Sequence, residues 1–428
     1  MPLPSGGTAN YYEAIAHNVL KGEGFTYYPY RLLDRQFMIP KTFENIPTTL
    51  EDIGVDLASD TRYAIRAPVY RYPPAYPLFI CACHLLFGPG PLAVVLVEIL
   101  LNGLVAVMIY RLAYHYFENE TLAVTAGILT AVWPFTLLNS LSYEPTSLLY
   151  VTVVGSIAAM TAYQRNGQRR FFILSGILSG LSAMLRTDAL FAAFGVAAAL
   201  LLAKTEPVGR KIRTAGFYLL LTAAVMSPWL IRNALVFHRF VPLSCGLGVN
   251  LVIGIGKYIP DSGFPADDRQ MIYRELGTEV YKDKMHTDDG CYPDGVEREE
   301  KRVQQAKAYI RSEPVKFLIS CVTRAPDLFF TGAETVSRRT GAGAGKLMRA
   351  ASTLLTIAEP ILFFLAILGL WVARPLWGKM SISIWAVIFY VIGHLPMWVE
   401  PRYFKPAWPF LLLFAVGVLL RLKKFQQK

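Results

Sequence analysis

Long apolar segments constrain this chain more than any other feature. A helix needs roughly 20 apolar residues to cross about 30 Å of hydrocarbon. Segments near that length occur at about 92–112, 121–139, 143–163, 171–186, 189–203, 214–231, 353–373, 381–399 and 404–421. With 54% hydrophobic and 17% charged residues, the 428-residue chain is too apolar for a soluble protein of its size. The sequence therefore predicts an all-α polytopic membrane protein with about 9–10 membrane segments.

Three regions depart from the pattern of simple spans. The segments 171–186 and 189–203 are short, so we expect a broken or re-entrant pair of helices. The run 75–88 is shorter still and follows two prolines, which favours an interfacial helix. We divide the chain into a first outer loop with interfacial helices (1–90), an N-terminal transmembrane bundle (91–231), an outer loop or lid with mixed structure (232–352), and C-terminal transmembrane helices with a basic tail (353–428).

Basic residues predict how the spans are oriented. Four basic segments are separated by pairs of spans: QRNGQRR (164–170), KTEPVGRKIR (204–213), ARPLWGK (373–379) and RLKKFQQK (421–428). Because short cytoplasmic loops are enriched in Lys and Arg, all four are expected in the cytoplasm. The net charge of +11 mainly reflects this basic belt, so nucleic-acid binding is not predicted. We expect a multi-pass cell-membrane protein, in a bacterial inner membrane, with its active site on the extracytoplasmic face.

Polar side chains collect on that expected outer face. They are Glu144 before Pro145, Arg186 and Asp188 in the helix break, Arg232 after a Pro-Trp pair, and Arg402 and Tyr403 in WVEPRYFKPAWPF (398–410). Each has a structural alternative, such as a first-turn acid favoured by the helix dipole, a local ion pair or an interfacial anchor. Ionisable groups at membrane depth are costly, however, so their accumulation favours a lipid-facing cleft. Its carboxylates would accept a proton, and its arginines would hold a phosphate leaving group.

No metal site is predicted from the sequence. The cysteines lack metal-ligand spacing, and His17, His84 and His394 are scattered along the chain. The cofactor is left unknown, with a divalent metal still open.

Five segments, taken in order, resemble a known family. They are YYEAIAHNVLKGEGF, YPPAYPLFICACHLLFG, SYEPTSLLY, PWLIRNALVFHRFVPLS and PRYFKPAWP. They are similar to integral-membrane glycosyltransferases of the GT-C class, in the family 39-like branch of protein O-mannosyltransferases and the aminoarabinose transferase of lipid A. The resemblance implies an inverting transfer of a sugar from a polyprenyl-phosphate carrier to a glycan, lipid or protein acceptor on the outer face.

The resemblance also assigns roles to individual residues. It implies that Glu144 is the family's second, catalytic acid and that Arg402 and Tyr403 lie beside the carrier phosphate. Arg232 matches as well, and Tyr12 begins the family's Tyr-x-x-Ile-Ala pattern. With Arg186 and Asp188, these residues form the predicted substrate-binding set.

One position departs from the family pattern. An acid is expected four residues before Tyr12, but Thr8 holds that place. We expect a chain that starts one span late at Met1. The alternatives are that Glu13 or Asp34 has replaced the acid, or that the protein is a catalytically inactive homologue.

A lipid-linked saccharide transporter or flippase is the alternative of a different class. Such a protein also needs many spans and a cationic cavity. Its binding groups, however, would lie near the membrane midplane between internal repeats. The predicted polar groups lie at one membrane edge instead, which favours an enzyme whose partners are a polyprenyl-phosphate-linked sugar, membrane lipid and an acceptor.

Overall fold

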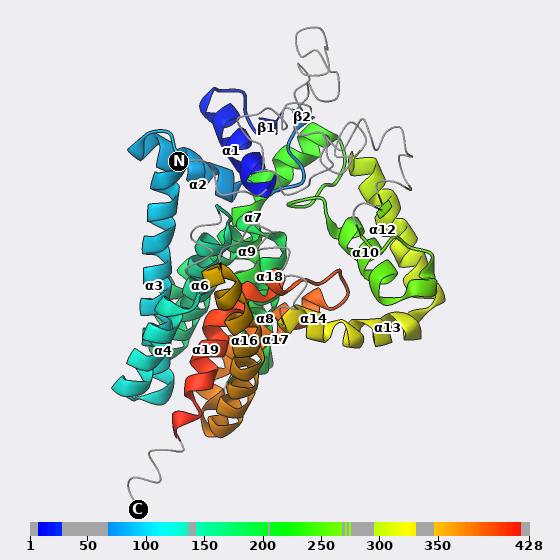
Figure 1. Ribbon diagram of the computed structural model, residues 1–428. Helices are drawn as coiled ribbons and strands as arrows, with labels where there is room; N and C mark the ends of the chain where they lie inside the picture. The colour runs from blue at the N-terminus through cyan, green and yellow to red at the C-terminus, as the bar shows by residue number, and fades with distance from the viewer. Residues whose placement is uncertain are drawn as a thin grey trace, which may run out of the picture.

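The computed structural model describes residues 7–27, 67–134, 136, 143–203, 206–267, 270–271, 274, 295–330 and 346–420, without the side chains of 7–10, 346–355 and 401–402. These residues form a bundle of helices that stand side by side, with smaller elements gathered at one end and along one flank (Figure 1). We call the end that carries α1 the upper end, as in Figure 1.

The bundle contains a helix for every predicted span. These helices are α3 (Pro91–Phe117), α4 (Glu120–Val132), α6 (Thr146–Asn166), α7 (Arg169–Leu185), α8 (Leu190–Leu202), α9 (Val208–Phe237), α16 (Lys346–Val372), α17 (Trp377–His394) and α19 (Trp408–Val416). Within the described residues, four stretches are long and apolar enough to cross a membrane: Pro91–Phe117, Thr146–Asn166, Val208–Phe237 and Arg374–His394. The predicted class, an all-α polytopic membrane protein, is confirmed.

Local sequence explains where several helices begin and end. Pro91 occupies the first turn of α3, where its missing N–H costs no hydrogen bond. The side chain of Asn119 accepts a hydrogen bond from the Leu122 N–H and caps α4. Gly167 ends α6 in the left-handed conformation that glycine adopts without strain. The predicted break between 171–186 and 189–203 is present, because α7 ends at Leu185 and the 3₁₀ helix η4 (Thr187–Ala189) leads into α8.

Small and hydroxyl side chains hold the centre of the bundle together. A Cβ atom on Gly180 of α7 would lie 2.5 Å from the Val225 Cβ of α9, so glycine permits this close approach. The Ser156 hydroxyl on α6 is 3.0 Å from the Ser175 hydroxyl and 2.7 Å from the Ser179 hydroxyl on α7. Close backbone approach and hydroxyl bonds are the usual means of helix association inside a membrane.

The upper end is built from the segment that the sequence predicts as the first outer loop, called here the upper outer segment. It comprises α1 (Gly7–Leu20), the two-residue strands β1 (Thr26–Tyr27) and β2 (Ala67–Pro68), and α2 (Ala75–Phe87). The strands pair antiparallel, with Thr26 opposite Pro68 and Tyr27 opposite Ala67. The helix α2 corresponds to the expected interfacial helix at 75–88, and α1 lies against it through the rings of Tyr12 and Tyr76, whose centroids are 4.9 Å apart.

A second unit, from the segment predicted as an outer loop or lid and called here the second outer unit, lies along one flank of the upper part of the bundle (Figure 1). It comprises α10 (Leu247–Tyr258), the 3₁₀ helix η5 (Pro260–Ser262), α12 (Gly295–Ser312), α13 (Pro314–Thr323) and α14 (Ala325–Phe329). Its own small apolar core consists of Leu251, Val252, Ile255, Ile259, Ala306 and Phe317. The Glu299 carboxylate on α12 accepts hydrogen bonds from the backbone N–H groups of Gly248 and Val249 at the start of α10. This carboxylate therefore caps α10 at the positive end of its dipole.

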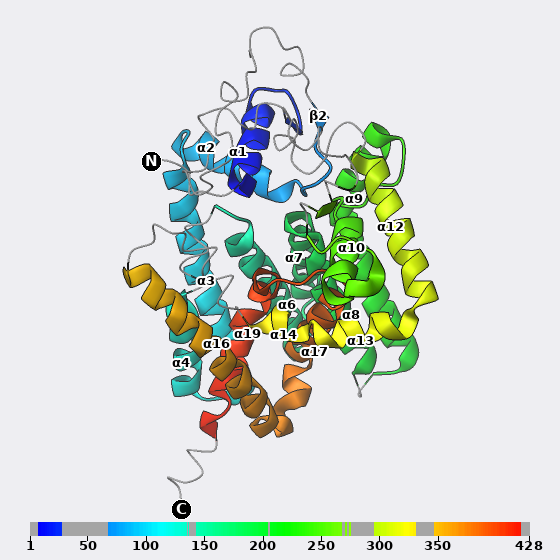
Figure 2. The same ribbon diagram turned by 45° about the vertical axis from the view of Figure 1, so that its right-hand side comes forward.

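The chain between α17 and α19 links the second outer unit to the bundle. It contains α18 (Pro401–Phe404) and the 3₁₀ helix η8 (Lys405–Ala407), while η7 (Arg374–Leu376) precedes α17. The Trp398 N–H donates a hydrogen bond of 2.7 Å to the Asn250 carbonyl of α10. In both views α13 runs across the direction of the bundle helices, beneath α10 and α12 (Figures 1 and 2).

Candidate active site

The break between α7 and η4 presents an ion pair. Arg186 has an extended backbone (φ −150°), which ends α7 and directs the chain into η4. Its Nε donates to Asp188 Oδ1 at 3.1 Å and its Nη2 donates to Oδ2 at 2.6 Å. Both side chains are largely buried, with relative exposures of 23% and 16%, so this bidentate pair is better shielded from water than a surface ion pair.

A histidine from α17 shares the same carboxylate. The Nε2 atom of His394 is 3.0 Å from Asp188 Oδ2, and its Nδ1 is 2.7 Å from the Tyr390 carbonyl. Asp188 therefore contacts Arg186, its neighbour in the chain, and His394, which comes from a distant part of the chain.

Two tyrosines complete this cluster. The Tyr390 hydroxyl donates to the Tyr403 carbonyl at 2.9 Å and lies 3.4 Å from Asp188 Oδ2. The Tyr403 ring has its centroid 5.4 Å from the guanidinium carbon of Arg186 and 6.1 Å from the His394 ring, to which it is nearly parallel. We call Arg186, Asp188, Tyr390, His394 and Tyr403 the Asp188 cluster. It joins η4, α17 and α18, and includes three of the predicted site residues.

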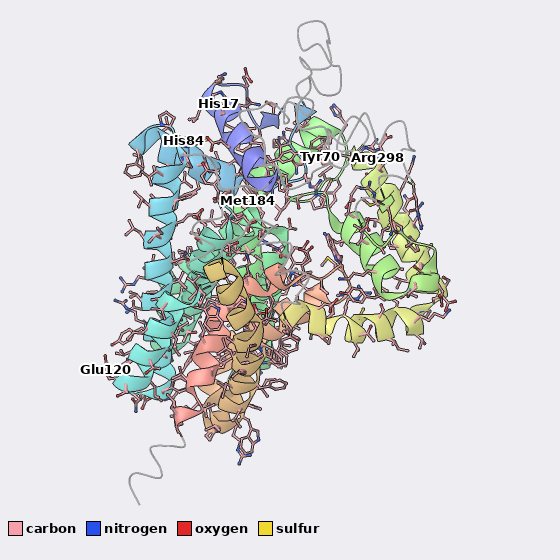
Figure 3. The ribbon with its side chains drawn as sticks, in the orientation of Figure 1. His17, Tyr70, His84, Glu120, Met184 and Arg298 are labelled. Atoms are coloured by element: carbon pink, nitrogen blue, oxygen red, sulfur yellow. The ribbon has the colours of Figure 1, made fainter. Side chains whose placement is uncertain are left out.

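Tyr12 and Glu144 lie close to this cluster. Tyr12 is only 4% exposed and packs against Tyr72 at 5.1 Å between ring centroids. Burial raises the pKa of the Tyr12 phenol, and the charges of Arg186 and Glu144 both act on it. Met184, two residues before Arg186, is seen directly below α1 in Figure 3, on the side of the bundle away from Glu120. Tyr12 on α1 therefore lies within electrostatic reach of Arg186 in the cluster and of Glu144.

The turn that carries Glu144 is held from its N-terminal side. Tyr143 has a φ of 52°, a left-handed conformation that is uncommon for a bulky residue and costs backbone energy. Its hydroxyl donates to the Glu13 carboxylate on α1, and His84 Nε2 on α2 lies 3.6 Å from the same carboxylate. Glu13 of α1, itself paired with His84 of α2, thus holds Tyr143 directly before Glu144.

The same turn is held from its C-terminal side by an acid that sequence reasoning missed. Glu98 on α3 is fully buried, and its carboxylate accepts hydrogen bonds from the Tyr76 hydroxyl at 2.6 Å and the Ser147 hydroxyl at 3.3 Å. Asn102, one turn further along α3, donates to the Ser147 hydroxyl at 3.2 Å. The sequence did carry a signal for Glu98, because it is the only acidic residue in the apolar segment 92–112. Charged residues inside membrane spans mark functional or buried polar sites.

Arg232 does not join these groups. Its guanidinium donates to the carbonyls of Val69 at 2.7 Å and Phe25 at 3.1 Å, and to the Asn233 side chain at 2.9 Å. It also lies over the Trp229 ring, 4.7 Å from its centroid. In this geometry Arg232 fastens the segments beside β1 and β2 to α9, so a role in substrate binding stays a prediction.

Other predicted positions lie outside the described part of the chain. This applies to the side chains of Arg402 and Thr8 and to the whole of Asp34. Among the described residues there is no group of three or more His, Cys, Asp or Glu that could hold a metal ion.

Comparison with known protein families gives a match to part of the chain. Residues 71–231 match the family model of dolichyl-phosphate-mannose-protein mannosyltransferases. This segment includes Glu144, Arg186 and Asp188. A comparison with curated protein sequences found no match.

Several solved structures are similar to this chain at low sequence identity. The oligosaccharyltransferase AglB of Archaeoglobus fulgidus, in complex with an inhibitory peptide and a dolichol-phosphate, has a TM-score of 0.50 and 14% identity, covering 100% of this chain and 48% of AglB. A second structure of the A. fulgidus enzyme, tethered to an acceptor peptide, gives 0.51 and 14%, covering 99% and 46%. ArnT of Cupriavidus metallidurans bound to undecaprenyl phosphate gives 0.38 and 13%, covering 97% and 74%.

The chain spans about half the length of the AglB chains that it matches. At 14% identity these structures show a shared fold alone. The match to a family model is confined to residues 71–231. Residues 71–231 thus match the family of dolichyl-phosphate-mannose-protein mannosyltransferases, and the chain shares the fold of the oligosaccharyltransferase AglB, in agreement with the resemblance that its ordered motifs indicated.

Proposed function

We propose that this protein transfers a sugar from a polyprenyl-phosphate carrier to an acceptor at the extracytoplasmic face of a cell membrane. The observation that carries the proposal is the Asp188 cluster, in which Asp188 and Tyr403 orient Arg186, together with Glu144, whose charge acts on the same Tyr12 phenol as that of Arg186. Side chains from separate segments hold the Arg186 guanidinium in place as a fixed cation. The turn before α6 supplies the Glu144 carboxylate. The dolichol-phosphate bound to AglB supports a lipid phosphate as the donor class.

The carrier phosphate would lie against Arg186. The tail of such a donor remains in the hydrocarbon, so its phosphate is held at the membrane surface, where the cluster and the upper outer segment meet. Asp188 and the Tyr403 ring hold the guanidinium in place. A cation fixed before the reaction stabilises the charge that develops on the leaving phosphate better than mobile water does. Arg402, the neighbour of Tyr403, would add a second cation.

Glu144 would act on the other side of the reacting carbon. The acceptor hydroxyl oxygen attacks the anomeric carbon as the bond from that carbon to the phosphate oxygen breaks. The bonding electron pair leaves with the phosphate, and the acceptor proton passes to the Glu144 carboxylate. Attack opposite the leaving group inverts the configuration at the anomeric carbon.

The test uses purified full-length protein in detergent with a panel of dolichyl- and undecaprenyl-phosphate sugars. We expect sugar transfer with release of polyprenyl phosphate. Glu144→Gln, Arg186→Gln and Arg402→Ala should each lower turnover at least about tenfold, equivalent to about 1.4 kcal/mol of barrier. The matched control is Arg210→Gln, because Arg210 is 62% exposed and pairs only with its helix neighbour Glu206 among the described residues. Its turnover should equal that of wild type.

The assay also separates the rival functions. Detergent solution has no compartments, so a transporter or flippase would release no polyprenyl phosphate there. A catalytically inactive homologue would bind donor without cleaving it. Wild-type rates in the Glu144 and Arg402 variants would refute the site assignment even if transfer occurs.

A further inference from the structure

The second outer unit carries an apolar helix face that no described element covers. We propose that α13 lies flat in the outer interface of the membrane, with this face in contact with lipid acyl chains. The partner is therefore the bilayer surface, and the residues that make this contact are not those of the Asp188 cluster.

The exposed side chains of α13 form one stripe. Val315, Leu318, Ile319 and Val322 are 66%, 64%, 58% and 71% exposed. Their spacing of i, i+3, i+4 and i+7 places them on the same side of the helix. Four large apolar side chains in one row are unfavourable in water, which favours an apolar environment for this face.

The buried side of α13 shows which way the stripe points. Phe317 is 8% exposed within the core formed with α10 and α12, and Ser320 is 2% exposed. In both views α10 and α12 lie above α13, on the same side as α1 (Figures 1 and 2). The opposite face must therefore point down, toward the level occupied by the bundle helices.

Lipid is a better occupant of this face than a second protein, because the apolar surface adjoins the lipid-facing bundle. The helix α13 runs directly into α14, and Phe329 of α14 contacts Phe363 of α16 with ring centroids 4.5 Å apart. On α16, Ile361 and Phe364 are 55% and 63% exposed, as expected for side chains that face acyl chains. At the start of α13 the surface is polar, with a Lys316–Glu313 ion pair of 3.3 Å whose side chains are 59% and 43% exposed. Apolar residues below and charges at the border are the pattern of a helix in the membrane interface.

This placement ties the membrane surface to the active site. Arg324, directly after α13, is fully buried and donates to the Ser320 carbonyl at 2.9 Å and to the Met397 carbonyl at 2.9 Å. Met397 lies in the segment that leads into α18 and Tyr403. A lipid-bound α13 would therefore hold the Tyr403 segment at the height of the lipid headgroups.

The test is a spin-label accessibility experiment in lipid nanodiscs. Single cysteines are placed by L318C, I319C, V322C and, as the control on the polar border, K316C, in a full-length variant whose five native cysteines are replaced by serine. We expect the first three labels to collide readily with dissolved oxygen and rarely with a water-soluble nickel chelate. The label at position 316 should show the reverse. Chelate access at 318, 319 and 322 equal to that at 316 would overturn the proposal, and so would protection from both reagents, which means that protein covers the face.

A second measurement uses the native sequence and does not depend on variants folding. Wild-type protein is reconstituted with a photoactivatable phospholipid, irradiated and digested with trypsin. We expect lipid adducts on the peptide of residues 317–324, at Leu318, Ile319 or Val322. Exposed residues of α3, such as Leu96 and Leu100, provide the positive control. Adducts on α3 without any on α13 would show that α13 does not contact the bilayer.

Discussion

At the scale of single residues, Asp188 decides how the proposed site is arranged. Its carboxylate contacts both Arg186 and His394, and the Tyr390 hydroxyl approaches it. Removing the negative charge leaves the Arg186 guanidinium and the His394 ring without the carboxylate that both contact. The residue is thus better described as an organiser of the phosphate-binding cation than as a group that reacts with the sugar.

We predict that Asp188→Asn lowers turnover at least about tenfold and lowers the free energy of unfolding by about 2 kcal/mol, because it breaks a largely buried ion pair. The measurements are polyprenyl-phosphate release and thermal unfolding in detergent. The control is Glu206→Gln, which removes an exposed ion pair with Arg210 and should change neither quantity measurably. An Asp188→Asn protein with wild-type stability and turnover would contradict the arrangement.

We predict that Tyr143→Phe lowers the free energy of unfolding by about 1–3 kcal/mol, because the Glu13 carboxylate loses a partly buried donor. Turnover should fall too, since the hydroxyl helps to hold the strained turn before Glu144. The matched control is Tyr110→Phe, which removes an exposed tyrosine–glutamate hydrogen bond to Glu120 and should have little effect. Thermal unfolding of the two variants side by side checks the prediction, and equal losses in both would refute it.

At the scale of elements, the site depends on how closely α8 and α17 pack. These helices carry the two sides of the Asp188–His394 contact, since η4 leads into α8 and His394 ends α17. Gly195 permits their approach, because a Cβ atom there would lie 2.5 Å from the Ala386 Cα and would clash with the Trp385 carbonyl. Helix spacing in the bundle therefore sets the geometry of the cluster.

We predict that Gly195→Ala separates α8 from α17 and lowers turnover at least about tenfold, equivalent to about 1.4 kcal/mol of barrier, because His394 withdraws from Asp188. The control is Gly216→Ala on α9, where a Cβ atom meets nothing within 4 Å and helix propensity should improve. Turnover and melting temperature of both variants are measured. A Gly195→Ala enzyme as active as the control would show that this spacing does not govern the site.

At the scale of the whole molecule, Arg324 connects the second outer unit to the chain that carries Tyr403. Its three donor groups are satisfied by Ser320 and Met397, and its guanidinium lies over the Tyr258 ring, 4.9 Å from the centroid. Gly254 of α10 lies against Trp398, Met397 and Arg324, so the contact surface is tightly packed.

We predict that Arg324→Ala loosens the second outer unit while the bundle stays intact. Its loss removes the donor to the Met397 carbonyl and opens a cavity, which together destabilise the contact by about 2–4 kcal/mol. Hydrogen–deuterium exchange should rise in α10, α13 and residues 395–400, and remain unchanged in α3 and α6. The control is Arg311→Ala, whose side chain is exposed on α12. Unchanged exchange in the outer unit would show that Arg324 is not the link.

The sequence alone was enough to predict the bundle, the broken pair of helices near Arg186, a short helix at 75–88 and the resemblance to GT-C glycosyltransferases. These features follow from local properties, since hydrophobic runs of the right length and ordered motifs are read along the chain without knowledge of contacts. The sequence also picked out Arg186, Asp188 and Tyr403, because charged and aromatic groups at the edges of spans are conspicuous there.

Only the tertiary structure decided which of these residues meet. Asp188 and His394 are separated by 206 positions, and no local spacing predicts their contact. The same holds for Glu98, whose partners come from α2 and α6, and for Arg232, which the fold assigns to backbone carbonyls beside β1 and β2. Local hydrophobicity determines that a segment forms a membrane helix, whereas the close approach of helices at glycine and serine determines which polar groups face one another.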